Sequence, residues 1–238
     1  MSSKKQKLPA MDRQMEIESA QMFGKHVSQE KAVLLLIVTV LACLSPIALG
    51  LQLWNDIPEI VSTGLILMTG EEDLLPRYMV VFGLPGLMCV LNVICHAQLR
   101  INQKRMTLPK TPVRLLGRWG FPVLSVIFCS GMIFQAADRS LSLLFITPCV
   151  IGMALLYLGA HMWDCPRSAK LALRFSFTQR GDSWQAVHRF AGWVWLVAGL
   201  AVIGATMILG TSGLIVAAII LLAVAAPFAY GYFRSTGL

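Results

Sequence analysis

The sequence predicts an all-α membrane protein folded as a bundle of six transmembrane helices. Hydrophobic residues make up 56% of the 238 residues and charged residues only 13%, and the mean hydropathy is +0.68. This composition is too apolar for a soluble domain and too evenly apolar for a protein with one anchoring tail. The apolar residues form six runs, each close to the roughly twenty residues that a membrane helix needs. These runs cover residues 32–53, 78–98, 119–136, 142–163, 190–209 and 213–232.

The distribution of positive charge predicts the orientation of the chain in the membrane. Lys and Arg gather before the first run, between the second and third runs, and between the fourth and fifth, whereas the other connections hold only Arg77 and Arg139. Because basic loops stay on the cytoplasmic side, both termini should be cytoplasmic, and the acidic connection after the first run should lie outside. Three units follow: a cytoplasmic segment 1–31, an N-terminal membrane half 32–136 and a second membrane half 137–238.

The cytoplasmic segment carries Met11, Met15 and Met22 at near-helical spacing. This pattern fits an amphipathic helix on the membrane surface and a solvated tail equally well. The segment is too long and too acidic for the start of a signal peptide, so we expect no cleavage.

Proline distinguishes the fifth run from the other five. A proline in a membrane helix usually produces an ordinary kink, and each of the other runs contains one. The fifth run lacks proline and is rich in glycine and alanine, which let neighbouring helices approach closely. We therefore expect a straight fifth helix in the interior of the bundle.

Several classes of function are disfavoured by the sequence. The net charge of +8 resides in the connections between apolar runs, so we expect no direct binding of nucleic acid. The six cysteines form no C-x-x-C pair and lie in or beside the runs, which is not a disulfide framework. No nucleotide-binding or hydrolase motif is present, and no run has Asp, Glu, Lys or Arg at its centre. We expect neither an enzyme nor a cofactor.

Histidine and cysteine side chains share one predicted membrane plane at the cytoplasmic ends of three runs. They are Cys95 and His96 after the second run, His161 and Cys165 after the fourth, and His188 before the fifth. One helical turn separates His161 from Cys165, a spacing that can present two ligands to zinc. Histidine is also common at membrane interfaces without any metal, and we expect no metal here; measuring bound zinc decides between the two readings.

The segment that leads into the fifth run is the most informative polar stretch. Asp182 can cap a helix with Gln185 three residues on, and no breaker follows before Gly210. A helix over 182–209 measures roughly 40 Å, so its first two turns should stand beyond the roughly 30 Å hydrocarbon core. Those turns carry Trp184, His188 and Arg189. Trp184 and His188 should share one face, turned toward the basic and aromatic segment 174–178, which is also a possible lipid-facing anchor.

This stretch resembles the signature of the SdpI family of bacterial immunity proteins. The family pattern has Gly-Ile-Arg-Thr-Pro-Trp-Thr, then Trp-x-x-x-Thr-His-Arg and a membrane span. The similarity covers about residues 148–209, and its matching positions are Arg174, Thr178, Trp184, His188 and Arg189. Phe175, Ser176 and Phe177 replace the Thr-Pro-Trp core, and the spacing is one residue shorter. In the first half, Ile57-Pro58, Arg77 and Pro85 resemble a second family pattern, in which Ile60 occupies the position of a histidine.

The resemblance implies a multi-pass protein of the bacterial plasma membrane that protects its producer from a secreted, membrane-active toxin. Some members also signal by recruiting a transcriptional repressor to the membrane. The five matching residues then form the expected binding site. The partners are the lipid bilayer, a peptide toxin on the outer face and a repressor on the inner face. The alternatives are a small permease for an apolar or peptide substrate, or a membrane enzyme using the His and Cys cluster.

Overall fold

The computed structural model describes residues 27–66, 72–104, 111–163, 165, 167, 172–175, 183–210 and 213–236. The methionine pattern of segment 1–31, the predicted cap at Asp182 and the site residue Thr178 lie outside the described residues. The statements below about structure concern the described part of the chain.

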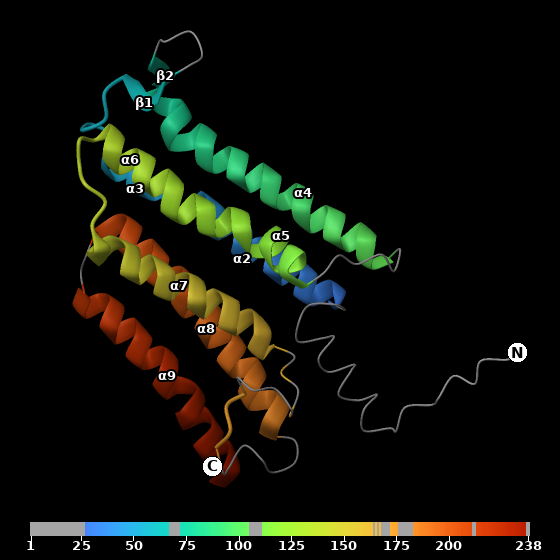
Figure 1. Ribbon diagram of the computed structural model, residues 1–238. Coiled ribbons are helices and arrows are strands. Elements are labelled where there is room, and N and C mark those ends of the chain that lie inside the picture. The colour runs from blue at the N-terminus through green and yellow to red at the C-terminus, as the bar shows by residue number, and fades with distance from the viewer. Residues whose placement is uncertain are drawn as a thin grey trace, which may run out of the picture.

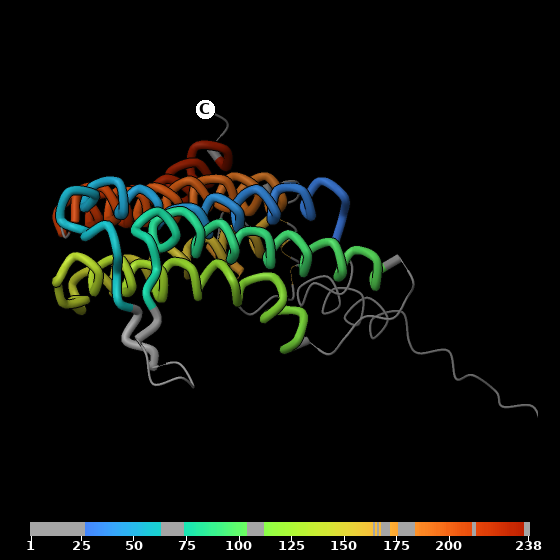
Figure 2. Tube along the Cα trace, turned by 90° about the horizontal axis from the view of Figure 1, so that it is seen from above, coloured from blue at the N-terminus to red at the C-terminus, as the bar shows by residue number. Residues whose placement is uncertain are grey.

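The predicted all-α bundle of six spans is confirmed (Figure 1). Six helical stretches are long and apolar enough to cross a membrane, and they lie side by side along one common direction in both views (Figure 2). The elements are α2 (Gln29–Leu44) with α3 (Pro46–Gln52); the π-helix η1 (Met79–Gly83) with α4 (Leu84–Lys104); α5 (Thr111–Leu124), η2 (Ser125–Cys129) and α6 (Ser130–Ala136); α7 (Leu143–Met162); α8 (Ser183–Leu209); and α9 (Gly213–Thr236).

The third span begins eight residues earlier than the sequence predicted. Its helix starts at Thr111 rather than at residue 119, so Arg114 and Arg118 belong to the helix and not to the preceding loop. Arg114 is only 7% exposed, and Arg118 is half-buried. The apolar count missed this turn because a long arginine side chain can bury its methylene stem while its charge reaches a polar level.

Pro46 and Pro122 lie beside junctions between helical segments, whereas Pro148 and Pro227 lie inside α7 and α9. Pro46 opens α3 directly after Ser45, whose hydroxyl donates to the carbonyl of Ala42 at 2.9 Å. Pro122 lies within α5 just before η2, where the Ser125 hydroxyl donates to the carbonyl of Cys43 on α2 at 2.6 Å. Hydroxyl groups thus occupy backbone acceptors near both bends. As predicted, α8 runs from Ser183 to Leu209 without a proline.

A short β-hairpin in the connection between the first two spans was not predicted. Strands β1 (Ile60–Ile66) and β2 (Glu72–Pro76) pair antiparallel, with Ile60 opposite Pro76. Arg77 follows the hairpin and fixes its base: its guanidinium donates to the carbonyls of Trp54 (3.0 Å) and Ile57 (3.1 Å) and stacks over the Trp54 ring at 4.4 Å. We call this end of the bundle the hairpin end.

The opposite end, which we call the basic end, carries most of the described positive charge. The helices alternate in direction, so it contains the start of α2, α5 and α8 and the end of α4, α7 and α9. At the hairpin end the described cations are Arg77 and Arg139. Three exposed carboxylates, those of Asp56, Glu59 and Asp138, lie at the same end. This asymmetry is the one that the positive-inside rule requires, while the orientation in the membrane stays a prediction. The described cations of the basic end are Lys31, Arg100, Arg114, Arg118, Arg167, Arg174, Arg189 and Arg234.

Glycine gives α7 and α8 the closest backbone approach described in the bundle. A Cβ atom at Gly159 would lie 2.9 Å from the carbonyl oxygen of Gly192, and one at Gly199 would lie 2.8 Å from that of Gly152. The two pairs lie two turns apart and step in opposite directions, so the helices are antiparallel. As predicted, the small residues of the fifth span serve helix packing, although Ala201 is exposed.

A methyl group at Gly199 should therefore destabilise the bundle. In Gly199→Ala the new Cβ meets Gly152 O and Leu156 Cδ2, both at 2.8 Å, whereas nothing lies within 4 Å of a Cβ at Gly204 on the same helix. We expect Gly199→Ala to lower the free energy of unfolding by about 1–3 kcal/mol, the usual cost of overpacking. Reversible unfolding in detergent micelles measures this effect, with Gly204→Ala as the matched control. Equal stability of the two variants would contradict this packing.

Candidate functional site

The first two turns of α8 hold a buried aromatic pair at the basic end. Trp184 is 7% exposed and His188 is 1% exposed. Their rings stack with centroids 4.1 Å apart and an interplanar angle of 28°. Residues four apart lie above one another on a helix, which brings the rings together as predicted. The pair faces the polypeptide that precedes α8 and is shielded from the surroundings.

Hydrogen bonds on both ring nitrogens fix the role of His188. Its Nε2 lies 3.0 Å from the backbone N–H of Leu173, and its Nδ1 lies 2.8 Å from the carbonyl oxygen of Trp184. An N–H needs an acceptor and a carbonyl needs a donor, so Nδ1 carries the hydrogen and Nε2 accepts. The imidazole is therefore neutral and fully occupied. It connects the start of α8 to the residue just before the predicted segment 174–178.

Trp184 makes a second connection to the same polypeptide. Its indole Nε1–H donates to the carbonyl of Cys165 at 2.9 Å. The Cys165 side chain is 6% exposed, and burial raises the pKa of its thiol to about 11, against smaller opposing effects of Lys31 and Arg174. We call Trp184 and His188, with their contacts to Cys165 and Leu173, the Trp–His lock.

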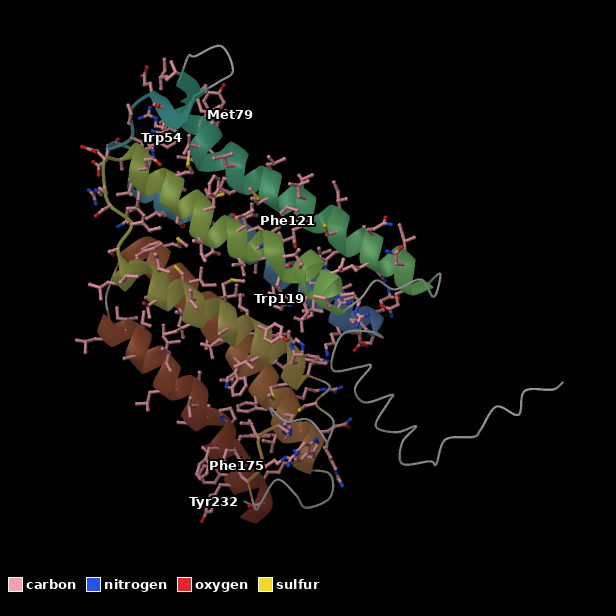
Figure 3. All side chains as sticks on the ribbon, in the orientation of Figure 1. Trp54, Met79, Trp119, Phe121, Phe175 and Tyr232 are labelled. Atoms are coloured by element: carbon pink, nitrogen blue, oxygen red, sulfur yellow. The ribbon has the colours of Figure 1, made fainter. Side chains whose placement is uncertain are left out.

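The two arginines of the predicted site lie at the surface around the lock. Arg189 is exposed, and its guanidinium carbon lies 5.5 Å from the ring centroid of Trp163 at the end of α7. Arg174 is exposed as well, and its guanidinium contacts the carbonyl of Arg167 at 3.4 Å. Phe175 packs edge-on against Phe228 of α9 with centroids 5.3 Å apart, beside the C-terminal part of that helix (Figure 3). Arg174 and Arg189 thus place positive charge on the surface around the Trp–His lock.

The possible zinc ligands do not converge. Within the part of the chain that the structure describes, no three His, Cys, Asp or Glu side chains gather as a metal site. His188 is occupied by the lock, and the Nδ1 of His161 lies 2.8 Å from the carbonyl of Tyr157 in its own helix. His96 contacts Thr39 on α2 and the backbone of Arg118 on α5 instead of Cys95 or any other predicted ligand.

Sequence reasoning missed a buried polar contact in the middle of the first two spans. Asn92 and Thr39 are both fully buried, and the Asn92 amide donates to the Thr39 hydroxyl at 3.0 Å. The signal was an amide in the second apolar run, whereas our count considered only charged groups. The sequence also could not reveal that backbone atoms of Leu173 and Cys165 complete the Trp–His lock.

Together these features define a multi-pass membrane protein whose fifth span begins with a buried Trp–His lock. The family model described as the SdpI/YfhL protein family matches residues 178–231, which contain most of α8 and α9. This match confirms the predicted resemblance for the C-terminal part of the chain and extends it beyond residue 209 into α9. No curated protein and no solved structure matches the chain.

Replacing His188 should release the segment that the lock holds. His188→Phe keeps an aromatic ring against Trp184 but leaves the N–H of Leu173 without its acceptor, at a cost of about 1–3 kcal/mol. We expect faster cleavage after Arg174 by trypsin in detergent-solubilised protein, read by mass spectrometry. The control is Gln185→Ala, an exposed position on the same turn of α8. Unchanged cleavage in His188→Phe would show that the ring does not hold the segment.

Proposed function

We propose that this protein is an immunity protein of the bacterial plasma membrane, which protects its producer from a secreted, membrane-active toxin. The observation that carries the proposal is the match of residues 178–231 to the SdpI/YfhL family at the segment where the chain builds its Trp–His lock. The lock is made of contacts between two aromatic rings and backbone atoms, and its one thiol, that of Cys165, is buried. A binding role suits this site better than catalysis.

The inner face of the proposed receptor is the basic end. Arg167, Arg174 and Arg189 are exposed there around the lock. A cluster of cations beside a membrane attracts anionic lipid and acidic protein surfaces. We propose that a transcriptional repressor docks on this surface, so that engagement of the toxin outside is converted into signalling inside.

The outer face of the proposed receptor is the hairpin end. Asp56 and Glu59 are exposed beside the hairpin, and Asp56 forms an ion pair with Arg139 at 2.6 Å. Glu71 lies outside the described residues, and the side chains of Glu72 and Asp73 are likewise not described. This connection is the acidic one in the sequence, which suits an encounter with a cationic peptide.

The permease alternative is less well supported by the interior of the first half. A transported substrate needs a continuous path, but Thr39 and Asn92 are fully buried and bonded to each other at the middle of α2 and α4. These two polar side chains therefore bond to each other and do not line an open path between α2 and α4. Immunity is therefore the function that we retain.

Protection is tested by expressing the full chain in a susceptible bacterium and adding a cationic pore-forming peptide. We expect expressing cells to keep their membrane potential, read with a voltage-sensitive dye, where cells with empty vector depolarise. The combined change Glu71→Gln, Glu72→Gln and Asp73→Asn should lower the protective effect by about tenfold in toxin dose, because electrostatic attraction governs encounter. Glu30→Gln, an exposed change at the basic end, is the control. Depolarisation despite expression would refute immunity, and full protection by the triple variant would refute the outer contact.

Repressor recruitment is tested with a fluorescently tagged candidate repressor from the producing bacterium. We expect the tagged protein to move from the nucleoid to the membrane when the toxin is added. The triple variant Arg174→Gln, Arg180→Gln and Arg189→Gln should abolish that movement while toxin protection persists, since Arg174 and Arg189 lie at the opposite end from the hairpin. Arg234→Gln, an exposed change at the end of α9, should recruit normally. Recruitment that survives the triple change would rule out docking on this surface.

A further inference from the structure

A cavity of about 590 Å³ lies at the basic end between α2, α4 and α5. It is separate from the Trp–His lock, which belongs to α8 and the segment before it. Three side chains with positive charge or a ring nitrogen line it: Arg100 and His96 from α4, and Arg118 from α5. Most of the remaining lining is aliphatic, including Leu36 and Val93, and none of the described lining residues carries a carboxylate. The cavity thus combines an apolar wall with cations.

The polar and apolar groups are arranged in depth. Along α4 the lining runs from Gln103 and Arg100 near the helix end to Val93, and from Arg100 to Val93 the helix rises by about 10 Å. The next residue inward, Asn92, is fully buried and bonded to Thr39. The cavity therefore has a closed apolar inner end and a cationic outer end, the polarity of one amphiphile with an anionic headgroup.

The hydrogen bonds of His96 leave one ring nitrogen for such a ligand. Thr39 gives its hydroxyl hydrogen to the carbonyl of Leu35 (2.8 Å) and accepts from Asn92 (3.0 Å). His96 Nε2, at 3.5 Å from that hydroxyl and 3.4 Å from the carbonyl of Arg118, therefore has only acceptors around it and carries the hydrogen. Nδ1 has no partner among the described residues, and in this neutral ring it is an acceptor, so it suits a hydroxyl of the ligand's headgroup and not its anionic oxygens.

The surroundings point to the bilayer as the source of the ligand. Val33 on α2 and Val93 on α4 line the cavity and are also 43% and 40% exposed, at faces that a spanning helix turns to lipid. A cavity of this size matches a small-ligand pocket, which suits a headgroup with the upper part of an acyl chain while the remaining chain stays in the membrane. Basic pockets between spans are suited to phosphate headgroups.

We propose that this cavity binds one anionic phospholipid of the surrounding bilayer. The phosphate lies at Arg100 and Arg118, a headgroup hydroxyl lies at His96, and the upper acyl chain lies along Leu36 and Val93. Lipid binding at this cavity rests on neither the family match nor the immunity function. The immunity function can therefore fail while lipid binding holds, and the reverse. It makes the first three spans a lipid-binding unit at the basic end.

The charge arm of the test uses purified full-length protein in phosphatidylcholine nanodiscs that contain a minor fraction of phosphatidylglycerol. We expect native mass spectrometry after detergent extraction to show one retained phosphatidylglycerol per chain. Arg100→Gln and Arg118→Gln should each reduce its retention by about tenfold, as expected for the loss of a charged hydrogen bond. Arg234→Gln, also at the basic end but outside the cavity, should retain it fully. The proposal is overturned if wild-type protein retains phosphatidylcholine as well as phosphatidylglycerol. It is also overturned if Arg100→Gln and Arg234→Gln retain equal amounts of phosphatidylglycerol.

The steric arm removes the cavity without changing charge. Val93→Trp fills the inner end and should abolish retention, whereas Val90→Trp, on α4 at a 56% exposed position outside the lining, should not. Thermal unfolding checks that the Val93→Trp and Val90→Trp proteins are folded. Their comparison then tests the cavity even if the Arg118→Gln protein does not fold. Displacement of phosphatidylglycerol by oleate or inorganic phosphate would assign the cavity to a fatty acid or a soluble anion and refute a phospholipid. Retention by Val93→Trp would place the lipid elsewhere and refute the cavity.

Discussion

The backbone contact between α7 and α8 is the constraint on which the rest of the site depends. Lipid tails are as apolar as leucine side chains, so spans associate through close packing and not through the hydrophobic effect. The pairs Gly159 with Gly192 and Gly152 with Gly199 provide that packing. They also fix the register, which places the end of α7 beside the first turns of α8. Trp163 consequently meets Arg189, and the returning chain meets Trp184 and His188.

The first three spans are held together differently. Besides aliphatic packing, two buried polar contacts join them: Ser125 to the backbone of Cys43, and Asn92 to Thr39 deep between α2 and α4. Such contacts fix partners in a membrane because each group would otherwise be left in hydrocarbon. The cavity at the basic end lies among these same helices, α2, α4 and α5.

Sequence reasoning reached the six spans and the unbroken helix 183–209 because both depend on composition along the chain. It also placed Trp184 and His188 on one face, since their spacing of four is a local property of a helix. It missed the hairpin, because β1 and β2 are short and their pairing is specified by contacts across a turn. It missed the helical turn with Arg114 and Arg118 because arginines near a membrane surface read as a loop. The acceptors and donors of Leu173 and Cys165 are backbone atoms, which carry no signal in a sequence.

The way the Trp–His lock is built also determines the order in which this region can assemble. Cys165 and Leu173, which follow α7, bond to the side chains of Trp184 and His188, which come later in the chain. These two contacts can therefore form only once the start of α8 is helical. They are two hydrogen bonds, whereas α7 and α8 share a long packed face. Local opening should therefore begin here, at a cost far below that of separating the spans.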